Sequence, residues 1–386
     1  MTGSARIQAV QSPIIPDVAA LIKETSGTIS LGQGVVHYGP PAQVFERLST
    51  FGRTVPENQY HLATGLPQLQ EALQEKLRAE NDIVVTADQV IAVTAGSNMG
   101  FYHALLCIAD PGDEIVMMSP YYFNHEMAVV MADCRPLLVP TDANYQPRLD
   151  AIAAALTERT RAVVTISPNN PSGAVYTPEV LQAINQLCRQ RGIYHICDEA
   201  YEYFTYDGAD HFSPGSLPDA GSYTISLYSL SKAYGMASWR VGYAVLPGHL
   251  LPAFKKVQDT ILICPPASSQ AAALGALQAG PAYCRQFIPG IARVRHLCLE
   301  RLQELGRLCN VPRSNGAFYL LARIDSDLPP MTLVEQLIRR HKVAVIPGTA
   351  FGLEACYLRI AYGALQEETV AEGMDRLISG LQEILT

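Results

Sequence analysis

Short apolar runs rich in β-branched residues alternate with longer amphipathic segments along the first two thirds of the chain. The runs lie at 89–93, 114–118, 162–166, 193–197, 224–227 and 241–245. Continuous apolar runs of this length are typical of strands that are buried on both faces. Helical patterns fill most of the gaps, so we expect an α/β fold with an open, mostly parallel sheet sandwiched by helices. The ligand site of such a sheet lies at the carboxyl ends of its strands.

The pattern changes after about residue 281. A long amphipathic segment at 282–305 predicts one helix, 317–322 predicts a strand, and 332–341 predicts a second helix. These elements predict a smaller α+β domain in the C-terminal part of the chain.

Composition supports two domains and excludes some partners. A chain of 386 residues with 48% hydrophobic and 17% charged residues can bury a large core. The formal net charge is −8 and no block of Lys or Arg stands out, so we expect no nucleic acid partner.

Cysteine usage and apolar run lengths bear on the compartment. The nine cysteines stand singly, without the paired spacing of metal ligands, which predicts reduced thiols and no metal site. The first residues lack the apolar core of a signal peptide, and no apolar run reaches the ~20 residues of a membrane span. We therefore expect a cytoplasmic protein with no membrane partner.

One segment, 229–243, combines groups that can hold a phosphorylated aldehyde. Lys232 can form a Schiff base, Ser229 and Ser231 offer hydroxyls, and Arg240 offers a planar fork that suits phosphate oxygens. An exposed lysine in a serine-rich turn would explain the same string in isolation.

A second segment, 94–100, follows a predicted strand and opens a helix. The backbone N–H groups at Gly96, Ser97 and Asn98 can receive an anion there, although a turn that merely starts a helix explains the same residues. The glycines of 32–37 do not complete a dinucleotide-binding motif, which argues against a dinucleotide site.

Four further positions suit chemistry on a flat nitrogen ring. Tyr122 can stack on the ring, although it could be a core tyrosine, and Asn170 lies in a turn after a predicted strand. Asp198 ends a predicted strand and could pair with a protonated ring nitrogen or cap a helix. Arg359 stands in an apolar run, a costly placement unless a carboxylate from a ligand or from the chain itself meets it.

In this order the motifs resemble those of class I pyridoxal-phosphate (PLP) aminotransferases, over nearly the whole chain from 31 to 359. The resemblance implies the PLP-dependent transferase fold type I, pyridoxal 5'-phosphate as cofactor, and amino acids and 2-oxo acids as substrates. It also implies a large PLP-binding domain at 41–283, a small C-terminal domain at 284–386, and an N-terminal segment at 1–40 that packs with the small domain.

The resemblance assigns a role to each candidate residue. Lys232, Asp198 and Tyr201 form the catalytic set, and Gly34, Asn170 and Arg359 bind the substrate, with Arg359 on its carboxylate. Tyr60 would reach the cofactor of a neighbouring subunit, which implies a homodimer with shared active sites. The cofactor-binding residues implied are Tyr60, Gly96, Ser97, Asn98, Tyr122, Asn170, Asp198, Tyr201, Ser229, Ser231, Lys232 and Arg240.

The expected reaction is ping-pong transamination of an uncharged or aromatic amino acid, such as methionine or phenylalanine. No arginine lies between Arg240 and Arg285, so the loop at 261–266 cannot supply a second carboxylate clamp. The segments 34–36, 120–123 and 201–204 resemble the methionine/aromatic branch, but Glu199 and Ala200 depart from it. An aspartate-type aminotransferase and a PLP-dependent lyase of the C–S or aminocyclopropane-carboxylate synthase kind are alternatives, whereas the acidic chain argues against a non-catalytic DNA-binding regulator.

Overall fold

The computed structural model describes residues 3–385, and its largest element is a seven-stranded sheet in the order β2-β8-β7-β6-β5-β3-β4. All neighbours are parallel except β8, which runs antiparallel to both β2 and β7. This confirms the mostly parallel sheet. The strands are β2 (Gln89–Thr94), β3 (Glu114–Ser119), β4 (Arg135–Pro140), β5 (Thr160–Ile166), β6 (Tyr194–Asp198), β7 (Thr224–Ser229) and β8 (Gly242–Pro247).

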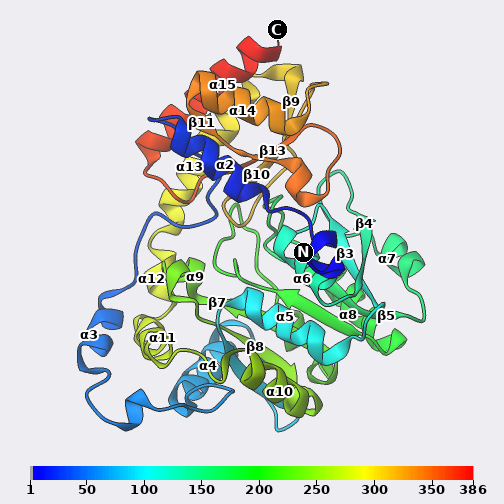
Figure 1. The fold of residues 1–386 in the computed structure, drawn as a ribbon, viewed down its shortest axis with the longest axis vertical. Helices are drawn as coiled ribbons and strands as arrows, with labels where there is room; N and C mark the ends of the chain where they lie inside the picture. Colours follow the sequence, from blue (N-terminus) through cyan, green and yellow to red (C-terminus); the bar gives the residue numbers. More distant parts are fainter. Residues whose placement is uncertain (1–2, 386) are drawn as a thin grey trace.

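Helices cover both faces of this sheet, which explains why its strands are apolar at successive positions. Met117 points to a core shared with Phe101 and Phe254, whereas its neighbour Val116 points to a core shared with Ile152 and Ile184. The covering helices are α5 (Ser97–Ile108), α6 (Phe123–Met131) and α10 (Leu251–Leu262) on the first face, and α7 (Leu149–Ala155) and α8 (Pro178–Arg191) on the second (Figure 1).

A second sheet gathers most of the C-terminal part of the chain. Its order is β12-β13-β10-β9, all antiparallel, with helices packed around it at the top of Figure 1. The strands are β9 (Cys309–Asn310), β10 (Tyr319–Ile324), β12 (Ile346–Pro347) and β13 (Tyr357–Ala361), and the helices are α13 (Ile288–Gln303), α14 (Pro330–His341) and α15 (Glu367–Leu385).

The N-terminal segment joins these C-terminal elements. Strand β1 (Ile29–Ser30) pairs in parallel with β11 (Val343–Ala344), and α2 (Ile14–Glu24) contacts α14. The short helix α1 (Ala5–Ala9) contacts α6 on the large sheet instead. The arrangement is compatible with the domain boundaries at 40 and 283, which stay a prediction. The remaining helices are α3 (Ala42–Thr50), α4 (Pro67–Glu80), α9 (Leu230–Ala233), α11 (Ala267–Ala279) and α12 (Pro281–Arg285).

Two expectations from the sequence were wrong in detail. The helix expected at 282–305 is broken into α12 and α13, because Pro289 lacks an N–H and its ring would clash with the carbonyl of Arg285 in a continuous helix. Strand β4 was not expected, because it begins and ends with Arg135-Pro136 and Pro140. It is an edge strand with mostly half-exposed or exposed residues, where proline is tolerated.

The described residues contain neither a metal-binding cluster nor a single membrane-spanning helix. No group of three His, Cys, Asp or Glu side chains within 3–385 is placed to hold a metal ion. No single helix in this range is long and apolar enough to cross a membrane, and one bent pair, 248–262 with 267–279, meets the criteria of length and composition.

Candidate active site

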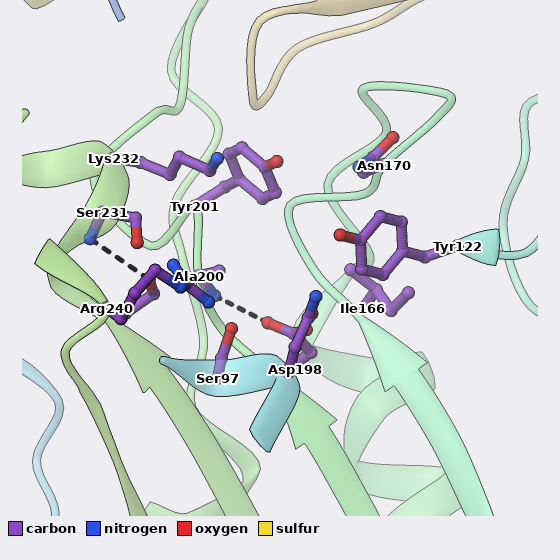
Figure 2. A pocket seen from close by; sticks show the side chains of 12 residues that line it. Ser97, Tyr122, Ile166, Asn170, Asp198, Ala200, Tyr201, Ser231, Lys232 and Arg240 are labelled. Atoms are coloured by element: carbon purple, nitrogen blue, oxygen red, sulfur yellow. Dashed lines mark hydrogen bonds between the residues drawn. The ribbon is translucent and has the colours of Figure 1, made fainter. Parts of the chain in front are cut away.

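The candidate site is a cavity at the carboxyl ends of the large sheet's strands. Figure 2 shows Lys232 and Asn170 entering it from opposite sides, with Tyr201 between them. Most of the predicted site residues therefore meet at one place, although the role of each stays a prediction. The lining residues are Ser97, Asn98, Tyr122, Ile166, Asn170, Asp198, Ala200, Tyr201, Ser229, Ser231, Lys232 and Arg240.

Lys232 lies on α9, a four-residue helix that starts directly after β7. Ser229 caps this helix by accepting a hydrogen bond from the Ser231 N–H at 3.2 Å, which fixes where the lysine leaves the backbone. The Lys232 Nζ donates to the Gly34 carbonyl at 2.6 Å. Burial, helped by nearby Arg359 and Arg240, lowers the pKa of Lys232 to about 8. The amine is therefore partly neutral near physiological pH and can act as a nucleophile or base.

A candidate anion site lies where β2 meets α5. Ser97 is the first residue of α5, so the unpaired N–H groups of the helix start face the cavity side of the sheet. Arg240 donates to the Ala237 carbonyl at 2.9 Å and has no carboxylate partner among residues 3–385. Gly96 has φ +85°, and a Cβ there would lie 2.5 Å from Arg240 Nη2. The helix start, serine hydroxyls and free guanidinium fit a phosphate group.

Asp198 occupies the end of β6 and is 4% exposed. Its Oδ1 accepts a hydrogen bond from the Ala200 N–H at 3.0 Å, but no helix begins there, so the alternative of a helix N-cap was wrong. Its Oδ2 lies 3.1 Å from His125 Nε2, and the His125 ring stacks on Phe101 with centroids 3.9 Å apart. The buried histidine lies against one carboxylate oxygen and the Ala200 N–H bonds the other, so the carboxylate has a neighbour on both oxygens.

Tyr122 and Tyr201 place aromatic side chains at the cavity wall (Figure 2). The Tyr122 hydroxyl accepts a hydrogen bond from Asn124 Nδ2 at 2.8 Å. The Tyr201 hydroxyl oxygen lies 2.6 Å from that of Tyr319, a residue on β10 of the second sheet. Tyr319 and His125 were missed from the sequence. Both lie in segments that were singled out, but nothing in those segments indicated what they contact.

Arg359 lies in the middle of β13 and is 2% exposed. Its guanidinium donates to Asn170 Oδ1 at 3.0 Å and to the Gly32 carbonyl at 2.6 Å. The rings of Tyr319 and Phe351 lie 4.7 and 5.0 Å from it. No carboxylate of residues 3–385 pairs with it, so the alternative of an intramolecular ion pair was wrong. A buried guanidinium without an acid favours a carboxylate supplied by a ligand.

Four predicted residues do not line the cavity: Gly96 and Arg359, described above, and also Gly34 and Tyr60. The Gly34 carbonyl accepts the hydrogen bond from Lys232, which does line the cavity, and a Cβ on Gly34 would collide with the Tyr319 hydroxyl. Tyr60 is 78% exposed and follows the short turn Pro56–Asn58. It does not line the cavity of its own chain, so its contact with a neighbouring subunit stays a prediction.

Comparisons with known proteins agree with this geometry. The model of the family "Aminotransferase class I and II" matches residues 26–377. An aromatic aminotransferase of Arabidopsis thaliana is 35% identical over 99% of this chain and 97% of its own. An aspartate/prephenate aminotransferase of Thermus thermophilus is 33% identical, with 97% of each chain covered.

Solved structures give the same result. A Thermus thermophilus aspartate aminotransferase double mutant superposes with a TM-score of 0.90 at 33% identity, covering 98% of this chain and 100% of that one. An aromatic aminotransferase from Pyrococcus horikoshii gives a TM-score of 0.86 at 31% identity, covering 95% and 99%. The chain therefore belongs to the class I and II aminotransferases and is an enzyme that depends on pyridoxal 5'-phosphate.

Proposed function

We propose that this aminotransferase moves the amino group of an aromatic or other uncharged amino acid to a 2-oxo acid. The observation that carries the proposal is the small number of cations at the site. Among the described residues, only Lys232 and Arg240 line the cavity as cations, and Arg359 lies beside it. In the expected complex Lys232 is joined to the cofactor, Arg240 pairs with the cofactor phosphate and Arg359 pairs with the substrate α-carboxylate. A second substrate carboxylate would therefore have no cation to pair with among these residues.

The donor set fits the cofactor. When bound, pyridoxal phosphate supplies an aldehyde that links to amines and a protonated ring that withdraws electrons. Lys232 would hold the aldehyde carbon, and Asp198 would hold the ring nitrogen. The hydroxyls of Ser97 and Ser231 and the Arg240 guanidinium would hold the phosphate, while Tyr122 would cover one face of the ring. His125 would keep the Asp198 carboxylate in place.

Arg359 would bind the substrate, and Lys232 would transfer its proton. The planar guanidinium binds the α-carboxylate with two parallel hydrogen bonds and so fixes the direction of the Cα–H bond. The substrate amine would displace the Lys232 amine, and the freed Lys232, whose pKa is lowered to about 8, would remove the Cα proton and later return a proton as general acid. Asn170 bonds Arg359 directly, so it connects the substrate-binding side to the cofactor-binding side.

A screen of amino donors tests the substrate proposal. Phenylalanine, tyrosine, methionine and aspartate are offered as donors with 2-oxoglutarate or phenylpyruvate as acceptor. We expect the highest kcat/KM with an aromatic donor or methionine, and parallel double-reciprocal plots. Aspartate as the best donor would overturn the proposal and favour the aspartate-type alternative, which the relatives from Thermus thermophilus also support. Keto acid and ammonia released without an acceptor would indicate the lyase.

We also propose that the enzyme is a homodimer with shared sites. Large apolar side chains are unusually exposed within one stretch of the chain, 45–62, where Phe45 is 55%, Val55 73%, Tyr60 78% and Leu62 59% exposed. Isolated apolar side chains on a surface are ordinary, but four in eighteen residues favour a buried interface. A second copy seated on this stretch would bring Tyr60 toward a neighbouring cavity.

A further inference from the structure

Tyr319 contacts three groups of the active site without lining the cavity itself. It begins β10 and is 1% exposed. Its hydroxyl oxygen lies 2.6 Å from that of Tyr201, and its ring faces the Arg359 guanidinium at 4.7 Å. The same hydroxyl is packed against Gly34, where a Cβ would collide with it.

The hydrogen bond between the two tyrosine hydroxyls can run in either direction, with Tyr201 or Tyr319 as the donor. Each phenol has one proton to donate, and one of the two protons lies in the bond that joins them. The other proton points to a third group. Tyr201 lines the cavity, whereas Tyr319 does not. A proton can therefore be offered to a ligand only when Tyr319 is the donor to Tyr201.

The surroundings favour that arrangement. Burial raises the pKa of Tyr319 to about 12, but the neighbouring Arg359 acts in the opposite direction. Burial raises the pKa of Tyr201 well above its ordinary value, and the contact with Tyr319 raises it further. The Arg359 guanidinium lies 4.7 Å from the Tyr319 ring, and a cation this close polarises that phenol's O–H bond, which favours Tyr319 as the donor of the pair.

We propose that Tyr319 is a positioning residue: it donates its proton to the Tyr201 hydroxyl and leaves the Tyr201 proton facing the cavity, directed to the phenolic oxygen of the cofactor. Its ring separately seats the Arg359 guanidinium. The inference rests on the proposed role of Tyr201. The other titratable or charged groups that face the pair are Tyr122, Lys232 and Arg359.

The test is a pH titration of the absorbance of the bound cofactor in the holoenzyme. A donor to the phenolic oxygen stabilises the basic form, so Tyr201→Phe should raise the midpoint by about 1 pH unit. Tyr319→Phe should raise it by about 0.5 of a unit, since Tyr201 stays but loses its fixed donor. The control is Tyr145→Phe, which removes another buried hydroxyl, one that donates to Leu321 of the same strand. It should not move the midpoint.

The double variant separates the possible outcomes. Tyr201→Phe with Tyr319→Phe should titrate like Tyr201→Phe alone, because Tyr319 acts through Tyr201. If Tyr201→Phe does not move the midpoint, the proposed role of Tyr201 fails. If Tyr201→Phe moves the midpoint but Tyr319→Phe does not, the inference about Tyr319 is overturned. It is also overturned if the double variant shows the sum of the two single shifts.

Two further variants provide a substitute in case Tyr319→Phe does not fold and test the contact between the Tyr319 ring and Arg359. Should Tyr319→Phe not fold, Gly34→Ala tests the same bond, since its Cβ would displace the Tyr319 hydroxyl, and it should raise the midpoint too. Tyr319→Phe keeps the ring over Arg359, so its KM for the amino acid should change less than twofold while kcat falls. Tyr319→Leu removes the ring and should raise KM about tenfold. Equal KM values for the two variants would refute the role of the ring.

Discussion

The Lys232 amine is buried, with two guanidinium groups and one carboxylate nearby. Burial and the two arginines disfavour its protonated form, whereas Asp198 favours it, and the net result is a pKa of about 8. This value is lower than that of an unfolded lysine. The cofactor-free folded protein therefore binds fewer protons than the unfolded chain between pH 8 and 10.5, and its stability from this group rises with pH in that range and is lowest below pH 8.

The rate at which the cofactor-free protein binds pyridoxal phosphate should depend on pH through the pKa of Lys232. Only the neutral amine attacks an aldehyde, so the second-order rate of capture by cofactor-free protein should rise about tenfold per pH unit up to pH 8 and level off above it. Stopped-flow absorbance between pH 6 and 10 measures the rate. A rate that still rises tenfold between pH 9 and 10 would mean an ordinary lysine.

Arg359 should be irreplaceable by lysine. An ammonium cannot reproduce the two parallel bonds to a carboxylate, nor the bonds to Asn170 and Gly32, so Arg359→Lys should lower kcat/KM about 100-fold. Steady-state kinetics with the best amino acid measure the change. Arg323→Lys, at an exposed position in the same sheet, is the matched control and should retain the wild-type value.

The sequence predicted most residues of the site because each one lies in a short motif at the end of an apolar run. Lys232, Asp198 and Arg359 are such residues. Tyr319 was missed because its partner Tyr201 is 118 positions away, and the chain contains 19 tyrosines. Which of them meet is decided by how two sheets pack, and a single sequence carries no record of that.

At the scale of elements, the junction between β2 and α5 depends on one glycine. Gly96 has φ +85° and faces Arg240, so Gly96→Ala would strain the backbone and displace the guanidinium. We expect the dissociation constant of pyridoxal phosphate to rise at least tenfold with the fold retained. Equilibrium dialysis of the cofactor-free protein tests this. Gly192→Ala has positive φ but open space around it, so it should leave the affinity unchanged.

Helix α4 is anchored by a buried ion pair. The side chains of Lys76 and Glu202 are 6% and 9% exposed, with 2.5 Å between Nζ and Oε2. Lys76→Met leaves the carboxylate buried without its cation and should lower the free energy of unfolding by about 3 kcal/mol. Adding Glu202→Gln should recover part of the loss.

Urea denaturation at pH 7 measures this prediction. The control is Arg78→Met on the same helix, which removes an ion pair with Glu75 that is largely exposed. Exposed pairs contribute little to stability, so this variant should unfold at nearly the wild-type urea concentration. Equal losses for the two variants would contradict the assignment of Lys76.

The strands were easier to predict from the sequence than the helix boundaries. Apart from the edge strand β4, the strands of the large sheet are largely buried, so their sequences are continuous apolar runs, as at Ala162 to Ile166 in β5. The break between α12 and α13 depends on a single proline within an amphipathic pattern that continues across it. Hydrophobic periodicity does not register such a break.

At the scale of the whole molecule, the exposed apolar stretch at 45–62 predicts that assembly and activity depend on each other. Leu62→Glu should place a charge in the proposed interface and shift the protein toward monomers, with loss of activity. Sedimentation velocity over a range of concentrations measures the assembly. Val84→Glu, at another exposed apolar position, is the control and should leave it unchanged. Wild-type protein that sediments as an active monomer would contradict the shared site.

The site combines side chains from the sides of two separate sheets, and two polar contacts at the site link them. Asn170 and Tyr201 belong to the large sheet side, and their partners Arg359 and Tyr319 belong to β13 and β10. The groups expected to hold the cofactor thus lie on one wall, and the clamp on the amino acid lies on the other. Divergence in substrate specificity can therefore arise from substitutions on the side of the second sheet, without altering the residues expected to bind the cofactor.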